Sequence, residues 1–339
     1  MRMPMRFLRS LRSSLTTAST VLCAAMTVLF PVACVSVDQN KGPASVIAVA
    51  EAGAEIEKTL ELDDDTRLVR STSESVNSYF ELRIQGREQA SAALRTTIAS
   101  RVDEDYEIFE EMALEGDLLL KRNIAVVCLG FADENRVRAR TSLLRIAENR
   151  SEMAFLRANA IRSVGILLDP DTPIGPVITL LDARDKKLRT EAAGAFKELA
   201  RVKKTPKVLT PQYHVAIERL AAMLYVKSNQ NGRVNAVWAL ANIRHPATFD
   251  HLVAALGDRY EEVQIGAIYG LTLLGDQRAL EPILSFLADG PTSAAESWCV
   301  KALRMIVIQA GLATDRAKLI PLGDSPRKWR EFIRAARFD

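Results

Sequence analysis

Residues 188–199 read LRTEAAGAFKEL, and this stretch decides the fold because five other segments repeat its pattern. A small residue is followed four positions later by a larger apolar one, and an apolar residue comes again three positions beyond. The small residues are Ala125, Ala160, Ala192, Ala236, Ala267 and Cys299. Positions four and three apart lie on one face of an α-helix, so each copy predicts a helix with one buried stripe.

The copies follow one another at spacings of 35, 32, 44, 31 and 32 residues, which leaves room for a partner helix between them. ATFDHLVAAL (247–256) and RALEPILSFL (278–287) fill two of these intervals with apolar residues at helical spacing. One such pair cannot bury its stripe alone, so the pairs must stack. We therefore predict an all-α fold, an α-solenoid of stacked antiparallel helix pairs with about six repeats plus terminal capping helices.

This organisation divides the chain into five predicted segments. They are a signal peptide (1–33), a linker (34–45), an N-terminal helical cap (46–102), the repeats (103–310) and a C-terminal capping helix (311–339). Trp329 in the last segment is expected to cover the end of the final repeat, because a terminal repeat would otherwise expose its apolar face.

Three short signals predict where helices begin and end. Thr210-Pro211 pairs a capping residue with proline at the first helical position. Gly275-Asp276 is typical of a helix end, and Asn231-Gly232 predicts a turn.

The repeated pattern resembles the HEAT-repeat family in its short bacterial form. LLDARDKKLRTEAAGAFKELA (180–200) carries the resemblance most clearly, with an aliphatic pair, Asp182, Leu188-Arg189 and an alanine-rich second helix. The ankyrin T-P-L-H and tetratricopeptide W-x-x-L-G patterns do not occur. An armadillo-like or irregular α-solenoid remains the alternative.

An arginine recurs at the start of four successive second helices, namely Arg122, Arg157, Arg189 and Arg233. Gln264 takes this position in the next copy. The resemblance implies that such arginines bridge neighbouring repeats, together with aspartates such as Asp182 or Asp258. A row of phosphate-binding arginines is the alternative.

The 44-residue spacing contains an insertion, RVKKTPKVLTPQYH (201–214). Its four positive charges are Arg201, Lys203, Lys204 and Lys207. A solvated loop is the simpler interpretation. The alternative is a contact for an anionic polymer or lipid headgroups, since binding residues concentrate on loops.

No catalytic motif is present. The three histidines form no HExxH helix or Cys–His zinc pattern, and a GxSxG elbow, a P-loop and a dinucleotide fingerprint are missing. Cys128 and Cys299 occupy small-residue positions of the repeat, which favours packing in the core over a redox or metal role. Trp238 and Trp298 lie within second helices, which favours packing for them as well. We expect a protein that is not an enzyme and holds no metal or cofactor. The alternative is a HEAT-type lyase, related to phycobilin lyases, or another small-molecule-handling enzyme.

The start of the chain is typical of an export signal, with four arginines and no acidic residue before an uncharged apolar run. A retained transmembrane anchor is the rival interpretation, but threonines and serine interrupt the run. The sequence PVAC (31–34) resembles a bacterial lipobox, which implies lipidation of Cys34 at a new N-terminus. Pro31 departs from the usual aliphatic residue, so simple secretion after a cut near Ser36 stays open.

Without its first 33 residues the chain holds 41 basic and 42 acidic residues, so it lacks the concentrated basic charge that nucleic-acid binding requires. We therefore expect an exported, lipid-anchored scaffold in the bacterial envelope that binds other envelope proteins through the solenoid surface. Membrane attachment would depend on the lipid on Cys34.

Overall fold

The computed structural model describes residues 63–336, which form helices, turns and bends without any strand. The predicted all-α fold is confirmed. The chain divides into two compact units, Met1–Glu134 and Asn135–Asp339. The expected signal peptide, the linker with Cys34 and the first part of the N-terminal cap lie outside the described residues, and the boundaries predicted at 103 and 310 stay predictions.

The first unit is built from four described helices: α3 (Asp64–Ile84), α4 (Glu88–Glu104), α5 (Tyr106–Glu115) and α6 (Leu119–Leu129). The carboxylate of Asp63 starts α3 by accepting a hydrogen bond from the backbone N–H of Thr66 at 2.7 Å. Helices α3 and α4 pack as a hairpin, and α6 packs on α3. The rings of Tyr79 and Phe131 meet edge to face there, with centroids 5.2 Å apart.

The second unit begins with five helix pairs. These are α7 (Arg136–Glu148) with α8 (Ala154–Leu167), α9 (Ile174–Leu181) with α10 (Lys186–Val202), α11 (Pro211–Leu224) with α12 (Gln230–Ile243), α13 (Phe249–Ala255) with α14 (Glu261–Leu274), and α15 (Leu280–Ala288) with α16 (Ser293–Gln309). Short 3₁₀ turns, η1 (Pro246–Thr248) and η2 (Gln277–Ala279), lead into α13 and α15. All six predicted second helices are present, as α6 and as the second members of these pairs.

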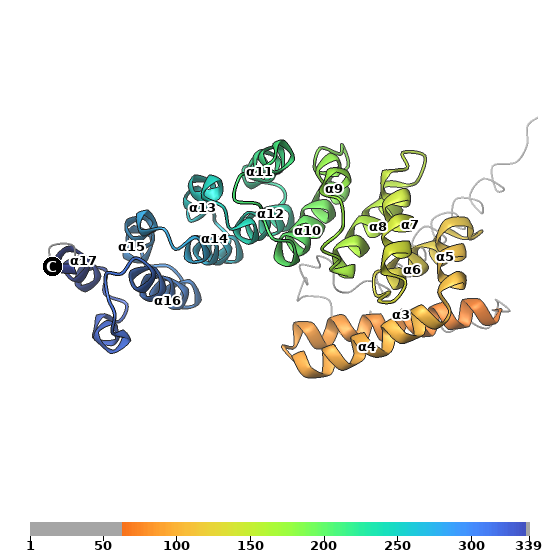
Figure 1. The fold of residues 1–339 in the computed structure, drawn as a ribbon, viewed down its shortest axis with the longest axis horizontal. Coiled ribbons are helices and arrows are strands. Elements are labelled where there is room, and N and C mark those ends of the chain that lie inside the picture. Colours follow the sequence, from red (N-terminus) through yellow and green to blue (C-terminus); the bar gives the residue numbers. More distant parts are fainter. Residues whose placement is uncertain (1–62, 337–339) are drawn as a thin grey trace, which may run out of the picture. The chain divides into compact units, whose positions relative to one another are not determined.

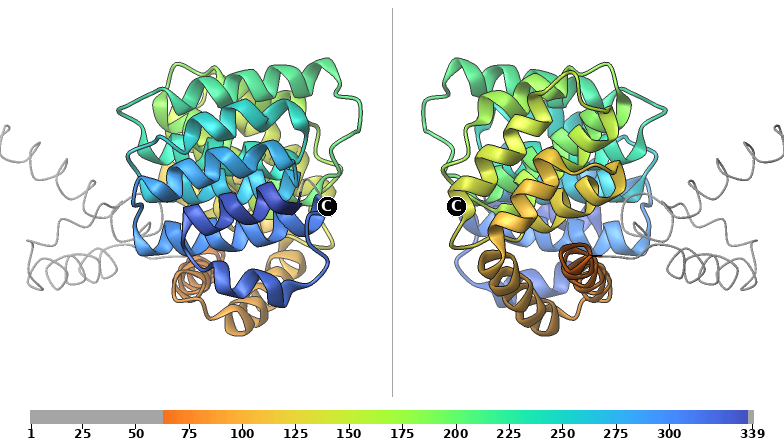
Figure 2. Two further views of the ribbon diagram at one scale, coloured as in Figure 1. Left: turned by 90° about the vertical axis from the view of Figure 1, so that its left-hand side faces the viewer. Right: turned by 90° about the vertical axis from the view of Figure 1, so that its right-hand side faces the viewer.

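Within the second unit, the first helices form one layer and the second helices form the other (Figure 1). Each second helix packs on the second helix of the next pair, from α8 to α16. Figure 2 shows the helices of successive pairs running side by side. The small residues of the repeat are fully buried and let neighbouring helices approach closely; in this unit they are Ala160, Ala192, Ala236, Ala267 and Cys299.

Two of the three predicted helix ends are confirmed. Thr210 precedes α11 with Pro211 at its first position, and Gly275 ends α14 with a left-handed φ of +64°. The turn predicted at Asn231-Gly232 is wrong, since both residues lie inside α12. Asn229 is the cap instead, because its side-chain oxygen accepts a hydrogen bond from the backbone N–H of Gly232 at 3.1 Å.

The insertion between α10 and α11 is tied to the connections on either side of it. The ammonium group of Lys203 donates to the carbonyl oxygen of Thr172, in the loop before α9, at 3.1 Å. On the other side, Nε2 of His245, which follows α12, lies 3.2 Å from the carbonyl oxygen of Lys207. The insertion therefore links three consecutive connections on one edge of the stack.

The second unit ends with a turn η3 (Arg316–Leu322) and helix α17 (Pro326–Ala336), which packs on α15. Trp329 is fully buried, and its indole N–H donates to the carbonyl oxygen of Gly323 at 3.0 Å. This side chain joins α17 to the turn before it. None of the described helices is long and apolar enough to cross a lipid bilayer.

Candidate functional site

The second helices of the second unit present one face away from the core. The position two residues after the buried small residue lies about 200° around the helix from it. From α8 to α16 that position holds Arg162, Gly194, Trp238, Tyr269 and Lys301. All five are at least partly exposed. We call the surface formed by these residues and their exposed neighbours on the second helices the outer face.

Three aromatic side chains form a row across the C-terminal half of the outer face. The ring centroids of Trp238 on α12 and Tyr269 on α14 lie 5.1 Å apart, and those of Tyr269 and Trp298 on α16 lie 6.2 Å apart. The ammonium nitrogen of Lys301 lies 5.3 Å from the centroid of the Trp298 ring, which is a cation–π distance. We call Trp238, Tyr269 and Trp298 the aromatic ladder.

A glycine on α14 allows the first ring of the ladder to lie close to that helix. A Cβ atom added to Gly266 would lie 3.1 Å from Nε1 of Trp238 and 2.7 Å from Cγ1 of Val237. A larger side chain would therefore displace the Val237 side chain and the Trp238 indole. At the other end, Met305 on α16 is 48% exposed and extends the apolar surface with a flexible thioether.

The N-terminal half of the outer face is charged. Glu191 on α10 is partly buried beside three cations, Arg162, Lys187 and Lys197. Burial raises the pKa of Glu191, although the three cations act in the opposite direction. The ammonium nitrogen of Lys187 lies 5.4 Å from the ring centroid of Phe155 on α8. The outer face thus changes from ionic on α8 and α10 to aromatic on α12, α14 and α16.

The recurring arginines have a structural role in the second helices. Each donates hydrogen bonds to carbonyl oxygens at or just after the end of the first helix of its own pair. Arg157, for example, donates from Nε to the carbonyl oxygen of Ala147 at 2.9 Å. The Gln264 amide donates to the carbonyl oxygen of Asp258 at 2.6 Å, so the substitution keeps the contact. These arginine N–H groups are therefore already bound to main-chain carbonyls and are not free to bind a phosphate.

One of these arginines also reaches the following pair. Nε of Arg233 lies 2.7 Å from Oδ2 of Asp258, which follows α13, and its Nη1 donates to the carbonyl oxygen of Val226 at 2.8 Å. The expected bridge between repeats is therefore present at Asp258. It is not formed by an arginine of this row at Asp182. There the partner is Arg219 of α11, at 2.6 Å, because that first helix carries its own arginine toward the preceding pair.

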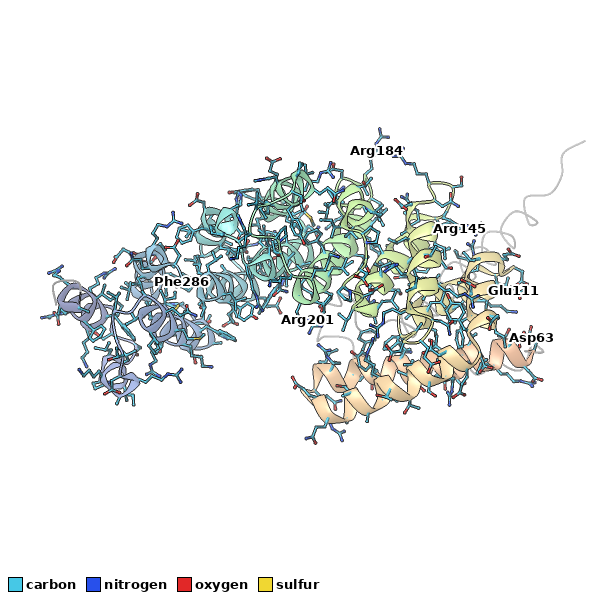
Figure 3. All side chains as sticks on the ribbon, in the orientation of Figure 1. Asp63, Glu111, Arg145, Arg184, Arg201 and Phe286 are labelled. Carbon is cyan, nitrogen blue, oxygen red and sulfur yellow. The ribbon has the colours of Figure 1, made fainter. Side chains whose placement is uncertain are left out.

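The four charges of the insertion are not equivalent. Arg201, labelled in Figure 3, pairs with Glu198 at 3.0 Å, and Lys203 is held by main-chain carbonyls. Lys204 and Lys207 are exposed, and their ammonium groups form no ion pair with the described residues. The structure leaves two of the four predicted charges available for a ligand.

The two described cysteines are free thiols in the core. Burial raises the pKa of Cys128 above its usual range and raises the pKa of Cys299 to about 12, so both stay protonated near neutral pH. Residues 63–336 contain no group of three or more His, Cys, Asp or Glu side chains placed to hold a metal ion. Cys34, the predicted lipidation site, lies outside this range.

Sequence reasoning missed Tyr269 and Lys301 as members of a site and treated Trp238 and Trp298 as packing residues. The signal was present in the aligned second helices, two positions after the small residue, where the structure places the outer face. Trp298 does not share this repeat position, because it comes directly before the small residue Cys299. It joins the aromatic ladder through its ring contact with Tyr269 on α14.

Comparison of the sequence with known families gives one match. Residues 217–304, which run from α11 into α16 and contain the aromatic ladder, match the family of HEAT repeats. The match covers the C-terminal part of the range for which the resemblance was predicted and excludes residues 180–200. Comparison with curated proteins gives no match.

Three solved structures illustrate the similarity of the fold. A designed armadillo repeat protein in complex with the peptide (KR)4 is 17% identical, with 58% of this chain and 99% of that chain covered and a TM-score of 0.46. An archaeal HEAT-like repeats protein from Thermococcus onnurineus NA1 is 16% identical, with 64% and 93% covered and a TM-score of 0.43. The complex of CpcE and CpcF of phycocyanin lyase from Nostoc sp. PCC7120 is 20% identical, with 65% and 94% covered and a TM-score of 0.36. These values imply no shared ligand or activity.

Proposed function

We propose that this protein is a non-catalytic scaffold that binds a partner protein through the outer face of its second unit. The aromatic ladder is the observation that carries the proposal. The proposal also includes a location: the protein is exported and held at the bacterial envelope by a lipid on Cys34.

The ladder lies where the fold itself does not need large aromatic side chains. The stack is held together on the opposite side of each second helix, by the buried small residues and the apolar positions that follow them. Removing apolar surface from water contributes about 25 cal/mol per Å², and aromatic residues are enriched where proteins bind one another. Three adjacent, partly exposed rings therefore favour a surface that a partner covers.

The chemistry of the ladder suits binding better than bond making. It offers two indoles, a phenol and the ammonium group of Lys301, which bind by stacking, apolar contact and cation–π attraction. The neighbouring thiol, Cys299, points into the core and stays protonated because burial raises its pKa to about 12. These groups support a scaffold rather than an enzyme.

Photo-crosslinking in living cells tests the binding part of the proposal. Tyr269 is replaced with p-benzoylphenylalanine, and the matched control carries the same residue at Phe286, a partly exposed aromatic position on first helix α15 (Figure 3). We expect a distinct protein adduct from position 269 and none from position 286. Equal labelling at both positions, or none at 269, would contradict a partner on the outer face.

The location is supported by the arginine-rich start of the chain, the uncharged run after it and the PVAC sequence. The mass of the N-terminal peptide, taken from protein isolated from its native cells, tests it. A diacylated or triacylated Cys34 is the expected result, and several acyl chains would anchor the protein stably. An unmodified terminus after Ser36 would replace anchoring with secretion, and an intact Met1 would refute export.

A further inference from the structure

We propose that the outer face binds an extended acidic segment of its partner, with apolar side chains on the aromatic ladder and carboxylates at the cations on either end. This inference rests on the proposed scaffold function and specifies the chemistry of the partner.

The outer face carries a cation on the last helix of the aromatic ladder and another on the helix before its first ring. On α16 Lys301 stacks on Trp298, and near the start of α10 Lys187 stacks on Phe155 of α8. Both side chains are exposed and neither ammonium group forms an ion pair with the described residues, so each can take a carboxylate, although Lys187 also lies near the partly buried Glu191. Around Lys187, cations also outnumber acids on the neighbouring outer positions of α8 and α10. Complementary charge on the partner therefore means acidic residues on both sides of an apolar centre.

The width and spacing of the aromatic ladder fit an extended chain. Side chains on one side of an extended segment recur about every 6.6 Å, close to the centroid separations of the rings. Those separations are 5.1 and 6.2 Å. A helix would need a trough for a cylinder about 10 Å wide, whereas the ladder is one side chain wide.

The distance between the two lysines sets the length of the segment. Lys187 on α10 and Lys301 on α16 are separated by three helix-to-helix steps. At about 9 Å for each step, the helices are about 27 Å apart, and Lys187 lies about 10 Å nearer the start of its helix than Lys301 does, so the span is about 29 Å. An extended chain crosses this distance in about nine residues. A nine-residue segment with acidic ends is therefore long enough to reach both lysines.

The distribution of charge favours a protein segment over single-stranded nucleic acid. Nucleic acid needs a basic track that follows its backbone between the stacking rings. On α12 and α14 the outermost positions are Trp238 and Tyr269, and the exposed charged residue near the start of α14 is Glu262. The aromatic middle of the outer face thus offers no such track.

The test uses the full-length protein and a fluorescein-labelled peptide, Glu-Asp-Leu-Pro-Leu-Pro-Leu-Asp-Glu. Its prolines permit an extended chain and prevent a helix. Fluorescence anisotropy is measured for the unmodified protein, for Lys187→Glu/Lys301→Glu and for the matched control Lys227→Glu/Lys318→Glu, which changes two exposed lysines away from the outer face. We expect the first variant to bind about tenfold more weakly and the control to differ less than about twofold.

Three further arms make the result specific. A peptide with lysine at both ends should bind the unmodified protein weakly and the Lys187→Glu/Lys301→Glu variant better. A peptide with serine in place of leucine should lose binding, and so should the Tyr269→Ser variant with the original peptide. Thermal unfolding of each variant confirms that a loss of binding is not a loss of folding.

Several results would overturn the inference. Equal binding of the acidic and basic peptides would remove the charge argument. Tight binding of only an analogue with alanine for proline, which permits a helix, would remove the extended geometry. Preferential binding of oligo(dT) would indicate nucleic acid instead. If no peptide binds while position 269 still captures a protein in cells, the outer face binds a folded surface and the scaffold function survives. If both experiments fail, both proposals fall.

Discussion

Replacing Arg233 with methionine removes an ion pair that links two helix pairs. The Arg233 side chain is 3% exposed. Its Nε lies 2.7 Å from Oδ2 of Asp258, and its Nη1 donates to the carbonyl oxygens of Val226 and Lys227 at 2.8 and 2.9 Å. Methionine fills a similar volume but leaves the carboxylate of Asp258, whose side chain is 12% exposed, without its cation. Loss of one partner of a buried pair costs about 3–5 kcal/mol.

The matched variant is Arg157→Met. Arg157 occupies the same position of the repeat and donates to the carbonyl oxygen of Ala147 at 2.9 Å, but no buried carboxylate depends on it. We expect Arg157→Met to lose about 1–3 kcal/mol, the cost of one hydrogen bond from a charged donor. The difference between the two variants reports the bridge to Asp258 together with the second carbonyl contact and the Tyr260 ring contact that Arg233 makes.

Urea unfolding followed by circular dichroism measures both losses, and hydrogen exchange shows where they act. A loss of 3–5 kcal/mol should lower Tm by about 10 °C in a unit of this size. Because repeats depend on their neighbours, protection should fall most in α12 and α13. Equal losses for Arg233→Met and Arg157→Met, or an unchanged α13, would refute the argument that Asp258 is held by Arg233.

Three further predictions concern buried or partly buried groups of the second helices. Burial raises the pKa of Glu191 in the folded state, so its stabilising contribution is present at low pH and is lost as pH rises through that pKa. Glu191→Gln should therefore raise Tm at pH 7, and the gain should shrink toward pH 4. A lower Tm of the variant at pH 7 would contradict this. Iodoacetamide at pH 8 should label Cys128 and Cys299 only after unfolding, because both thiols are buried and burial keeps them protonated. Peptide mass mapping measures the labelling. Rapid labelling of the native protein would contradict this expectation. In Gly165→Ala the new Cβ would lie 2.8 Å from Cα of Ala195, so α8 and α10 must separate. We expect this to lower the free energy of unfolding in urea by about 1–3 kcal/mol. An unchanged midpoint would show that the two helices already have room.

The fold was accessible from the sequence because it depends on a short-range pattern. The spacing of Ala160, Val164 and Leu167 places these residues on one helix face, and all three are buried. Repetition of this pattern makes stacking the only way to bury it. The cap of α12 was missed because Asn231-Gly232 has the composition of a turn, while the hydrogen bond to Gly232 comes from Asn229.

The candidate site was less accessible because it depends on contacts between helices. Trp238 and Tyr269 share a repeat position, but Trp298 does not, and the row exists only because α14 and α16 pack side by side. The same limit applies to Lys203. Its charge resembled that of Lys204 in the sequence, and only the structure shows that its ammonium group is held by the carbonyl of Thr172.

The attachment of the insertion has a mechanical consequence. A stack of helix pairs bends when the angle between neighbouring pairs changes. Such bending alters the separation of the connections along one edge of the stack. Lys203 and Lys207 fasten the insertion to the connection before α9 and to the one after α12. The stack from α9 to α12 is therefore stiffened, and most of the bending is left to the helix pairs that follow, which carry Tyr269 and Trp298 of the aromatic ladder.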